Sequence, residues 1–266
     1  MTRIIAIANQ KGGVGKTTTS INLAASLAAT RKRVMLIDMD AQGNATMGSG
    51  VDKHNLDYTM LEVLLGEIQL ADALIETGET QYRLLPANAT LTAAKVDLLA
   101  IDDREFQLRN QLQTVVDDYD YILIDCPPAL DMLTVNALVA AKTVLIPMQC
   151  EYFALEGLSD LVETIEAISE SVNPELRLEG VLRTMFDPRS RLAREVSGQL
   201  TRHFGDKLYR TVIPRNVRLA EAPSYGQAIF DYDRRSKGAV AYLALAGEFI
   251  RRYRAMEKTT PTRQAL

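Results

Sequence analysis

The amino-acid sequence predicts an α/β fold in which a mostly parallel sheet is flanked by helices on both faces. Three observations favour this class: continuous Val-, Ile- and Leu-rich runs, helical patterns that alternate with them, and acidic or glycine-rich turns where several runs end. The 266 residues are 47% hydrophobic, which suits one large domain with a substantial core. We expect that domain over residues 1–257 and a flexible polar tail over residues 258–266.

The expected elements alternate along the chain. The run Ile4–Ala8 is expected to form the first strand, and a helix-compatible stretch from Ser20 to Ala29 follows a glycine-rich turn. The later apolar runs predict strands at Val34–Asp38, Tyr82–Pro86, Tyr121–Asp125, Thr143–Pro147, Leu178–Arg183 and Leu208–Ile213. Helices are expected at Glu105–Val116, Leu155–Ser171 and Arg191–His203, with a closing helix from Gly238 to Met256. Because ligands of parallel sheets lie beyond the carboxyl ends of the strands, the segments that follow these strands should meet at one site.

The first turn carries the strongest signal in the chain, Lys11-Gly12-Gly13-Val14-Gly15-Lys16-Thr17-Thr18. Glycines allow backbone N–H groups to turn inward around an anion, and the N-terminus of the following helix adds a partial positive charge. In such a loop Lys16 reaches the β- and γ-phosphates and the Thr17 hydroxyl holds Mg²⁺. The standard pattern has glycine at position 10, where this chain has Gln10, and a second lysine, Lys11, stands next to it. The turn is therefore predicted to bind a nucleotide with Mg²⁺.

Acidic residues end two of the expected strands. Asp38 and Asp40 lie at the end of the second strand, where a carboxylate could orient a water for attack on the γ-phosphate or could simply cap a turn. The run Tyr121–Asp125 has the Walker B layout, in which a strand fixes a carboxylate that holds Mg²⁺, often through water. Thr17 and Asp125 are therefore expected at the metal.

Charge is distributed unevenly along the chain. The formal net charge is -4, but residues 177–266 carry a net of +9 and residues 1–176 a net of -13. Such asymmetry favours a polyanionic or acidic partner for the basic segment, although a solvated charged face would look the same. The two cysteines, Cys126 and Cys150, lack metal-ligand spacing and are interpreted as reduced thiols of a cytoplasmic protein. No apolar run approaches the length of a membrane span, and no signal peptide is visible.

Three segments together resemble the ParA/MinD ATPases. The glycine-rich turn has the K-G-G-x-G-K-T form of that family's deviant Walker A motif. Residues Asp38–Asn44 resemble its switch I, D-x-D-P-Q-G-N, with Ala41 in place of the proline, and Ile213–Gly226 resembles P-R-N-V-R-L-x-E-A-P-S-x-G. The resemblance extends from Ile4 to about Arg252 and implies a P-loop NTPase fold of the deviant Walker A type.

The resemblance also implies roles for single residues. Lys11 would reach across a dimer interface to the partner's nucleotide, Asp40 would position the attacking water, and Asp38 would support Mg²⁺ or the loop geometry. The residues implied at the base are Thr184, Met185, Pro214 and Asn216. The residues implied or expected at DNA are Arg189, Arg218, Arg235, Lys237 and Arg251.

These residues support one leading hypothesis about function and leave three alternatives. The leading hypothesis is a cytoplasmic, nucleoid-associated DNA-partitioning ATPase that uses ATP and Mg²⁺, forms an ATP-dependent homodimer, binds DNA without sequence preference and responds to a ParB-like partner. A MinD-like membrane ATPase would need an amphipathic helix with bulky apolar residues, which the tail Glu257–Leu266 lacks. A positioning ATPase for another cargo and a P-loop enzyme that acts on a small metabolite are the other two alternatives.

Overall fold

An eight-stranded sheet forms the centre of the computed structural model, which describes residues 2–78, 82–152 and 154–259. The strand order is β3-β4-β2-β5-β1-β6-β7-β8, and every neighbouring pair is parallel except β3 and β4. The strands are β1 (Arg3–Ile7), β2 (Val34–Asp38), β3 (Ile75–Glu76), β4 (Arg83–Leu85), β5 (Tyr121–Asp125), β6 (Thr143–Gln149), β7 (Arg177–Phe186) and β8 (Leu208–Pro214). The predicted fold class is confirmed.

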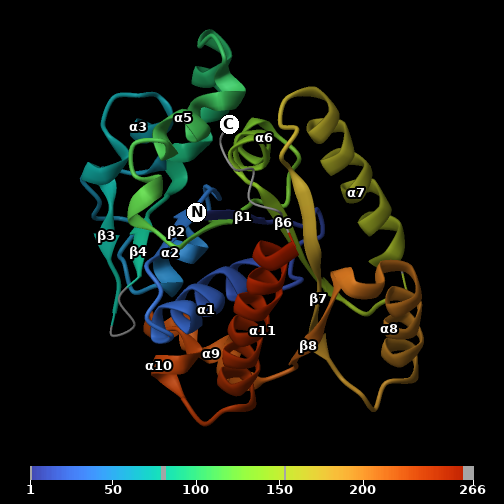
Figure 1. Cartoon of the computed structure of the whole chain (residues 1–266). Helices are drawn as coiled ribbons and strands as arrows, with labels where there is room; N and C mark the ends of the chain where they lie inside the picture. The colour runs from blue at the N-terminus through green and yellow to red at the C-terminus, as the bar shows by residue number, and fades with distance from the viewer. Residues whose placement is uncertain (1, 79–81, 153, 260–266) are drawn as a thin grey trace.

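Helices cover both faces of this sheet (Figure 1). They are α1 (Lys16–Ala29), α2 (Asn44–Gly48), α3 (Met60–Leu64), α4 (Ala94–Asp97), α5 (Gln107–Leu112), α6 (Met132–Ala140), α7 (Ala154–Ser171), α8 (Arg191–Phe204), α9 (Val217–Glu221), α10 (Ile229–Tyr232) and α11 (Lys237–Thr259). Alternate residues of β1 enter different cores, with Ile4 packed on the side of α6, α7 and α8, and Ile5 on the side of α1 and α11. This alternation explains why each central strand is apolar throughout.

Each of the seven expected strands is present, with boundaries that move by a few residues. The two-residue strand β3, which pairs antiparallel at the edge, was not expected. The helix expected at Glu105–Val116 is regular only over α5, because Thr114, Val115 and Val116 are poor helix formers. Helix α6 was also not expected, although Asp131 caps it by accepting hydrogen bonds from the backbone N–H groups of Leu133 and Thr134.

The last helix continues beyond the expected end at Met256. Helix α11 runs to Thr259, and most of the expected tail, residues 260–266, lies outside the described residues. Within the described part of the chain, no helix combines the length and the apolar character that crossing a membrane requires.

Candidate functional site

The glycine-rich turn between β1 and α1 is shaped as an anion cradle. Gly13 and Gly15 have φ angles of +73° and +89°, which are conformations that side chains with a Cβ rarely adopt. A Cβ on Gly12 or Gly13 would meet no atom within 4 Å, so this side of the loop is open to a ligand. Among the described residues, no side chain caps the first turn of α1, which begins at Lys16 and is 14 residues long. Its N–H groups can therefore bind phosphate oxygens.

Lys16 lies inside the turn. Its side chain is buried, and its Nζ donates a hydrogen bond to the Lys11 carbonyl at 3.2 Å. Burial lowers the pKa of Lys16, while the nearby Asp125 and Asp40 carboxylates act in the opposite direction. A buried ammonium that uses a loop carbonyl as its acceptor is well placed to exchange that contact for phosphate oxygens.

Two buried carboxylates lie side by side below the turn. Asp38 ends β2 and Asp125 ends β5, and the two residues are paired in the register of these strands. Burial raises the pKa of both, and for Asp38 the charge of Asp125 adds to the effect. Asp125 Oδ1 accepts a hydrogen bond from Ser20 Oγ at 2.7 Å, but its buried Oδ2 has no partner among the described residues. An oxygen without a hydrogen-bond partner, on a carboxylate that the Thr17 hydroxyl also stabilises, fits a hydrated divalent cation.

The described residues contain no cluster of three or more His, Cys, Asp or Glu side chains that could hold a metal. Mg²⁺ is usually held by one or two protein ligands together with phosphate oxygens and water.

Asp38 is occupied by the loop that follows it. Its Oδ2 accepts hydrogen bonds from the backbone N–H and the hydroxyl of Thr46, both at 2.8 Å, and its Oδ1 accepts one from the Asp40 N–H at 3.1 Å. Of the two roles expected for Asp38, these contacts favour support of the loop. Asp40 is half-buried and accepts a hydrogen bond from the Gln42 N–H at 3.0 Å. The turn forms with Ala41 in the place of the family's proline.

The carboxyl ends of β7 and β8 form the side of the turn. Thr184 Oγ1 donates to the Val14 carbonyl at 2.7 Å, and Met185 has a φ of +47°, an uncommon conformation for a residue other than glycine. Pro214 pairs with Phe186 at the end of β8, and Asn216 caps α9 through the Leu219 N–H. The four residues expected at the base, Thr184, Met185, Pro214 and Asn216, are therefore all at the same end of the sheet as the turn.

Gln149 belongs to this group and was missed from the sequence. Its amide nitrogen lies 2.6 Å from Met185 Sδ and 3.5 Å from the Gly13 carbonyl. Only its position as the last residue of the strand Thr143–Gln149 could have indicated that Gln149 lies beside the glycine-rich turn.

The Lys11 side chain is engaged by a residue outside the glycine-rich turn. Its Nζ forms an ion pair with Glu151 Oε2 at 2.5 Å, and the two side chains are 47% and 51% exposed. Thr18 is half-buried at the start of α1, where its carbonyl accepts a hydrogen bond from Asn22.

Four of the five expected DNA-contacting residues cluster near the ends of β7 and β8. Arg189 follows β7 and is paired with Asp187, and Arg218 on α9 is paired with Glu221 and more loosely with Asp233. The Arg235 N–H donates to the same Asp233, and Lys237 begins α11. Figure 1 shows α9 and the loop before α8 at the lower end of the molecule.

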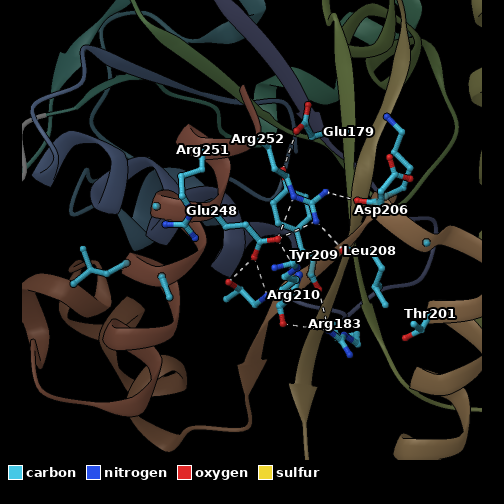
Figure 2. A pocket seen from close by; sticks show the side chains of 16 residues that line it. Glu179, Arg183, Thr201, Asp206, Leu208, Tyr209, Arg210, Glu248, Arg251 and Arg252 are labelled. Atoms are coloured by element: carbon cyan, nitrogen blue, oxygen red, sulfur yellow. Dashed lines mark hydrogen bonds and ion pairs between the residues drawn. The ribbon is translucent and has the colours of Figure 1, made fainter. Parts of the chain in front are cut away.

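Arg251 lies apart from those four residues. It is 14 positions after Lys237 on α11, which corresponds to about 21 Å along the helix. It lines a groove of about 1000 Å³ between β7, β8 and α11 (Figure 2).

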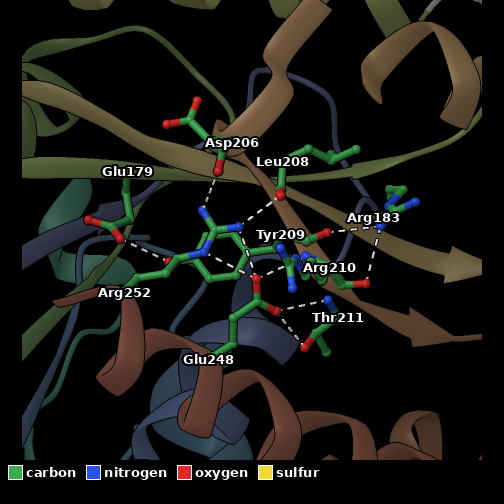
Figure 3. Close-up of polar contacts among 9 residues, drawn as sticks. All are labelled: Glu179, Arg183, Asp206, Leu208, Tyr209, Arg210, Thr211, Glu248 and Arg252. Carbon is green, nitrogen blue, oxygen red and sulfur yellow. Dashed lines mark hydrogen bonds and ion pairs between the residues drawn. The ribbon is translucent and has the colours of Figure 1, made fainter. Parts of the chain in front are cut away.

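Side chains satisfy the backbone of the edge strand in this groove (Figure 3). Glu248 accepts hydrogen bonds from the N–H groups of Arg210 and Thr211 and from the Thr211 hydroxyl, and Arg252 donates to Glu248 and to the carbonyls of Asp206 and Leu208. These contacts satisfy backbone groups of β8 in and next to the stretch where its pairing with β7 is irregular.

Comparison with known proteins agrees with this geometry. The family model described as an AAA domain matches residues 2–178. The chromosome partitioning protein ParA of Myxococcus xanthus is 50% identical over 94% of this chain and 88% of its own length. The sporulation initiation inhibitor protein Soj of Bacillus subtilis is 49% identical over 93% of this chain and 98% of its own length.

Solved structures show the same architecture. A Mycobacterium smegmatis protein named cobyrinic acid a,c-diamide synthase, with bound ADP and magnesium, superposes with a TM-score of 0.84 at 37% identity over 96% of this chain and 97% of its own. The cell division ATPase MinD of Pyrococcus furiosus gives a TM-score of 0.77 at 27% identity, covering 94% of this chain and 99% of its own.

Proposed function

The chain belongs to the ParA/MinD family of ATPases, and we propose from this premise that it is a DNA-partitioning ATPase whose ATP-bound dimer binds DNA without sequence preference. ATP and Mg²⁺ are its cofactors, as the nucleotide- and magnesium-bound relatives indicate. The DNA-binding part of this proposal is supported by the positions of two arginines. Arg189 and Arg218 leave the sheet at the same ends of parallel strands as the phosphate cradle, so a ligand at the cradle can influence both.

The nucleotide site supports hydrolysis through a division of roles. The N–H groups of the turn and the Lys16 ammonium bind and orient the phosphates, and Thr17 and Asp125 hold the cation. When bound, Mg²⁺ would neutralise the negative charge that develops on the phosphate during hydrolysis. Asp40, which is only half-buried at the edge of the cradle, orients the attacking water.

Lys11 serves the dimer in this proposal. Its ammonium lies outside the cradle and is paired with an equally exposed carboxylate, Glu151, so it has no phosphate-binding role within its own subunit. An exposed ion pair of this kind contributes little stability and is readily exchanged for a more strongly charged partner. The γ-phosphate of a second subunit is such a partner, and closure of the dimer would then release Lys11 from Glu151.

DNA binding follows from dimer closure, since two copies of each arginine then face one ligand. Arg189 and Arg218 are 88% and 55% exposed, and their present acidic neighbours can be displaced by phosphates. Nucleoid association and stimulation by a ParB-like partner belong to the same proposal. They rest on the chromosome-partitioning relatives rather than on a particular contact.

Salt-dependent DNA titrations of Arg189→Ala and Arg218→Ala with ATP test this proposal. Each substitution removes two phosphate contacts from a dimer, so the slope of log K against log salt should fall by about 2 in each variant. Arg33→Ala is the matched control, because Arg33 is 59% exposed and paired with Asp120 but precedes β2 at the opposite ends of the strands. Unchanged slopes in both test variants would show that the DNA interface lies elsewhere. A wild type that binds no DNA would favour the alternative of a P-loop enzyme that acts on a small metabolite.

A further inference from the structure

The loop after α2 touches the turn after α9, and two glycines make this contact possible. Gly50 and Gly226 have φ angles of +84° and +63°. A Cβ on Gly226 would lie 2.6 Å from Gly50 Cα, and a Cβ on Gly50 would lie 2.7 Å from the Gly226 carbonyl oxygen. The two backbones are therefore in direct contact, and neither position has room for a side chain.

On one side, this contact is tied to the nucleotide site. Gly50 closes the turn that follows α2, with its N–H donating to the Met47 carbonyl at 3.0 Å. Helix α2 is held in turn by Thr46, which donates two hydrogen bonds to Asp38 and accepts one from the Ala87 N–H at 2.9 Å. These hydrogen bonds tie α2 directly to the Asp38–Asp40 segment.

On the other side, the contact is tied to the DNA-contacting segment. Gly226 ends the 3-10 turn η7 (Ala222–Tyr225), which continues α9 without a break, and α9 carries Arg218. The Gly226 N–H donates to the Pro223 carbonyl at 3.0 Å, which fixes the glycine to that turn. Helix α2 also lies beside η7, since a Cβ added at Gly48 would come within 3.6 Å of Pro223 Cβ.

We propose that the Gly50–Gly226 contact transmits the nucleotide state from the Asp38–Asp40 segment to α9, so that ATP increases DNA affinity partly within each subunit. This inference rests on the proposed DNA-binding function and adds a route for its regulation. Rigid backbone contact at both glycines transmits displacement without a flexible side chain between the segments. Couplings between sites typically change affinity 5- to 150-fold and act reciprocally, so DNA should increase ATP affinity by the same factor.

Gly226→Ala tests the route, with Gly66→Ala as the matched control. Gly66 has a similar φ of +73°, but a Cβ there would meet no atom within 4 Å, so the control adds the same backbone strain without separating two segments. The measured quantity is the ratio of DNA affinities with ATP and with ADP. In Gly226→Ala we expect this ratio to fall about 10-fold, with ATP affinity in the absence of DNA and ATP-dependent dimerisation unchanged. The control should keep the wild-type ratio.

Hydrogen exchange on the wild type provides a measurement that no folding defect can obscure. Replacing ADP by ATP, without DNA, should change the protection of the amides of residues 44–51 and of residues 217–226 together. A change confined to residues 44–51 would overturn the inference, as would a wild-type affinity ratio in Gly226→Ala. A wild type that binds no DNA would refute the proposed function, and the exchange result would still decide whether the two segments are linked.

Discussion

The end of the sheet with the glycine-rich turn, the phosphate-binding end, and the edge of the sheet at β8, the β8 edge, each contain a buried acidic residue, but the two carboxylates of Asp125 and Glu248 differ in their partners. At the phosphate-binding end, Asp125 keeps an unpartnered oxygen and burial raises its pKa. At the β8 edge, Glu248 accepts hydrogen bonds from Arg210, Thr211 and Arg252, and these donors lower its pKa although burial acts against them.

This difference separates a ligand site from an architectural cluster. A carboxylate whose donors are all supplied by the protein has nothing to gain from a cation, whereas one that is buried with an open lone pair is stabilised by binding one. The β8 edge has a groove of about 1000 Å³, yet its polar groups are directed at one another.

The largest expected effect is on ATP turnover and comes from substituting Asp40, the acidic residue at the edge of the cradle. Asp40→Ala should slow ATP turnover by about 100-fold or more, because an oriented water is lost, while ATP affinity stays near the wild-type value. Single-turnover hydrolysis together with calorimetric ATP binding would measure both quantities. Wild-type turnover in this variant would remove Asp40 from the reaction.

The next effect should appear only in stability. Glu248→Ala leaves the Arg252 guanidinium, whose side chain is 19% exposed, without its carboxylate, and should cost about 3 kcal/mol of unfolding free energy. The control is Glu195→Ala, which breaks another i,i+4 pair, Arg191–Glu195, whose side chains are 86% and 56% exposed, and should cost less than about 0.5 kcal/mol. Chemical denaturation measures both, and equal losses would show that the β8 edge is not held by Glu248.

The smallest effect has the opposite sign and depends on pH. Because burial raises the pKa of Asp125, folding favours its protonated form, and stability is lost as pH rises from the unfolded value of about 4 through the folded pKa. Asp125→Asn should therefore raise the melting temperature of the nucleotide-free protein by about 2–4 °C at pH 8, with no gain near pH 4. Glu248, whose folded pKa is lowered, contributes stability that is lost as pH falls.

Thermal melts across pH measure this contrast. If Asp125→Asn were less stable than the wild type at pH 8, the ionised Asp125 would not destabilise the nucleotide-free protein.

The phosphate-binding end could be predicted from sequence, and the β8 edge could not. The turn at Gly12–Thr17 and the acid at the end of the strand Tyr121–Asp125 are local patterns whose meaning is fixed by the strand beside them. Glu248 and Arg252 are spaced like any exposed helical pair, so only the fold reveals that they satisfy an edge strand. The contact of Gly50 with Gly226 joins residues far apart in the chain and leaves no local signature.

If ATP at the cradle controls non-specific DNA binding, a DNA titration of the wild-type protein shows this without any substitution. Two duplexes of unrelated sequence should be titrated with the full chain in Mg²⁺ with ATP or with ADP, at several salt concentrations. We expect similar affinities for both duplexes with ATP, a steep loss of affinity with salt, and weak binding with ADP. Binding that ignores the nucleotide, or that selects one of the two sequences, would contradict this expectation.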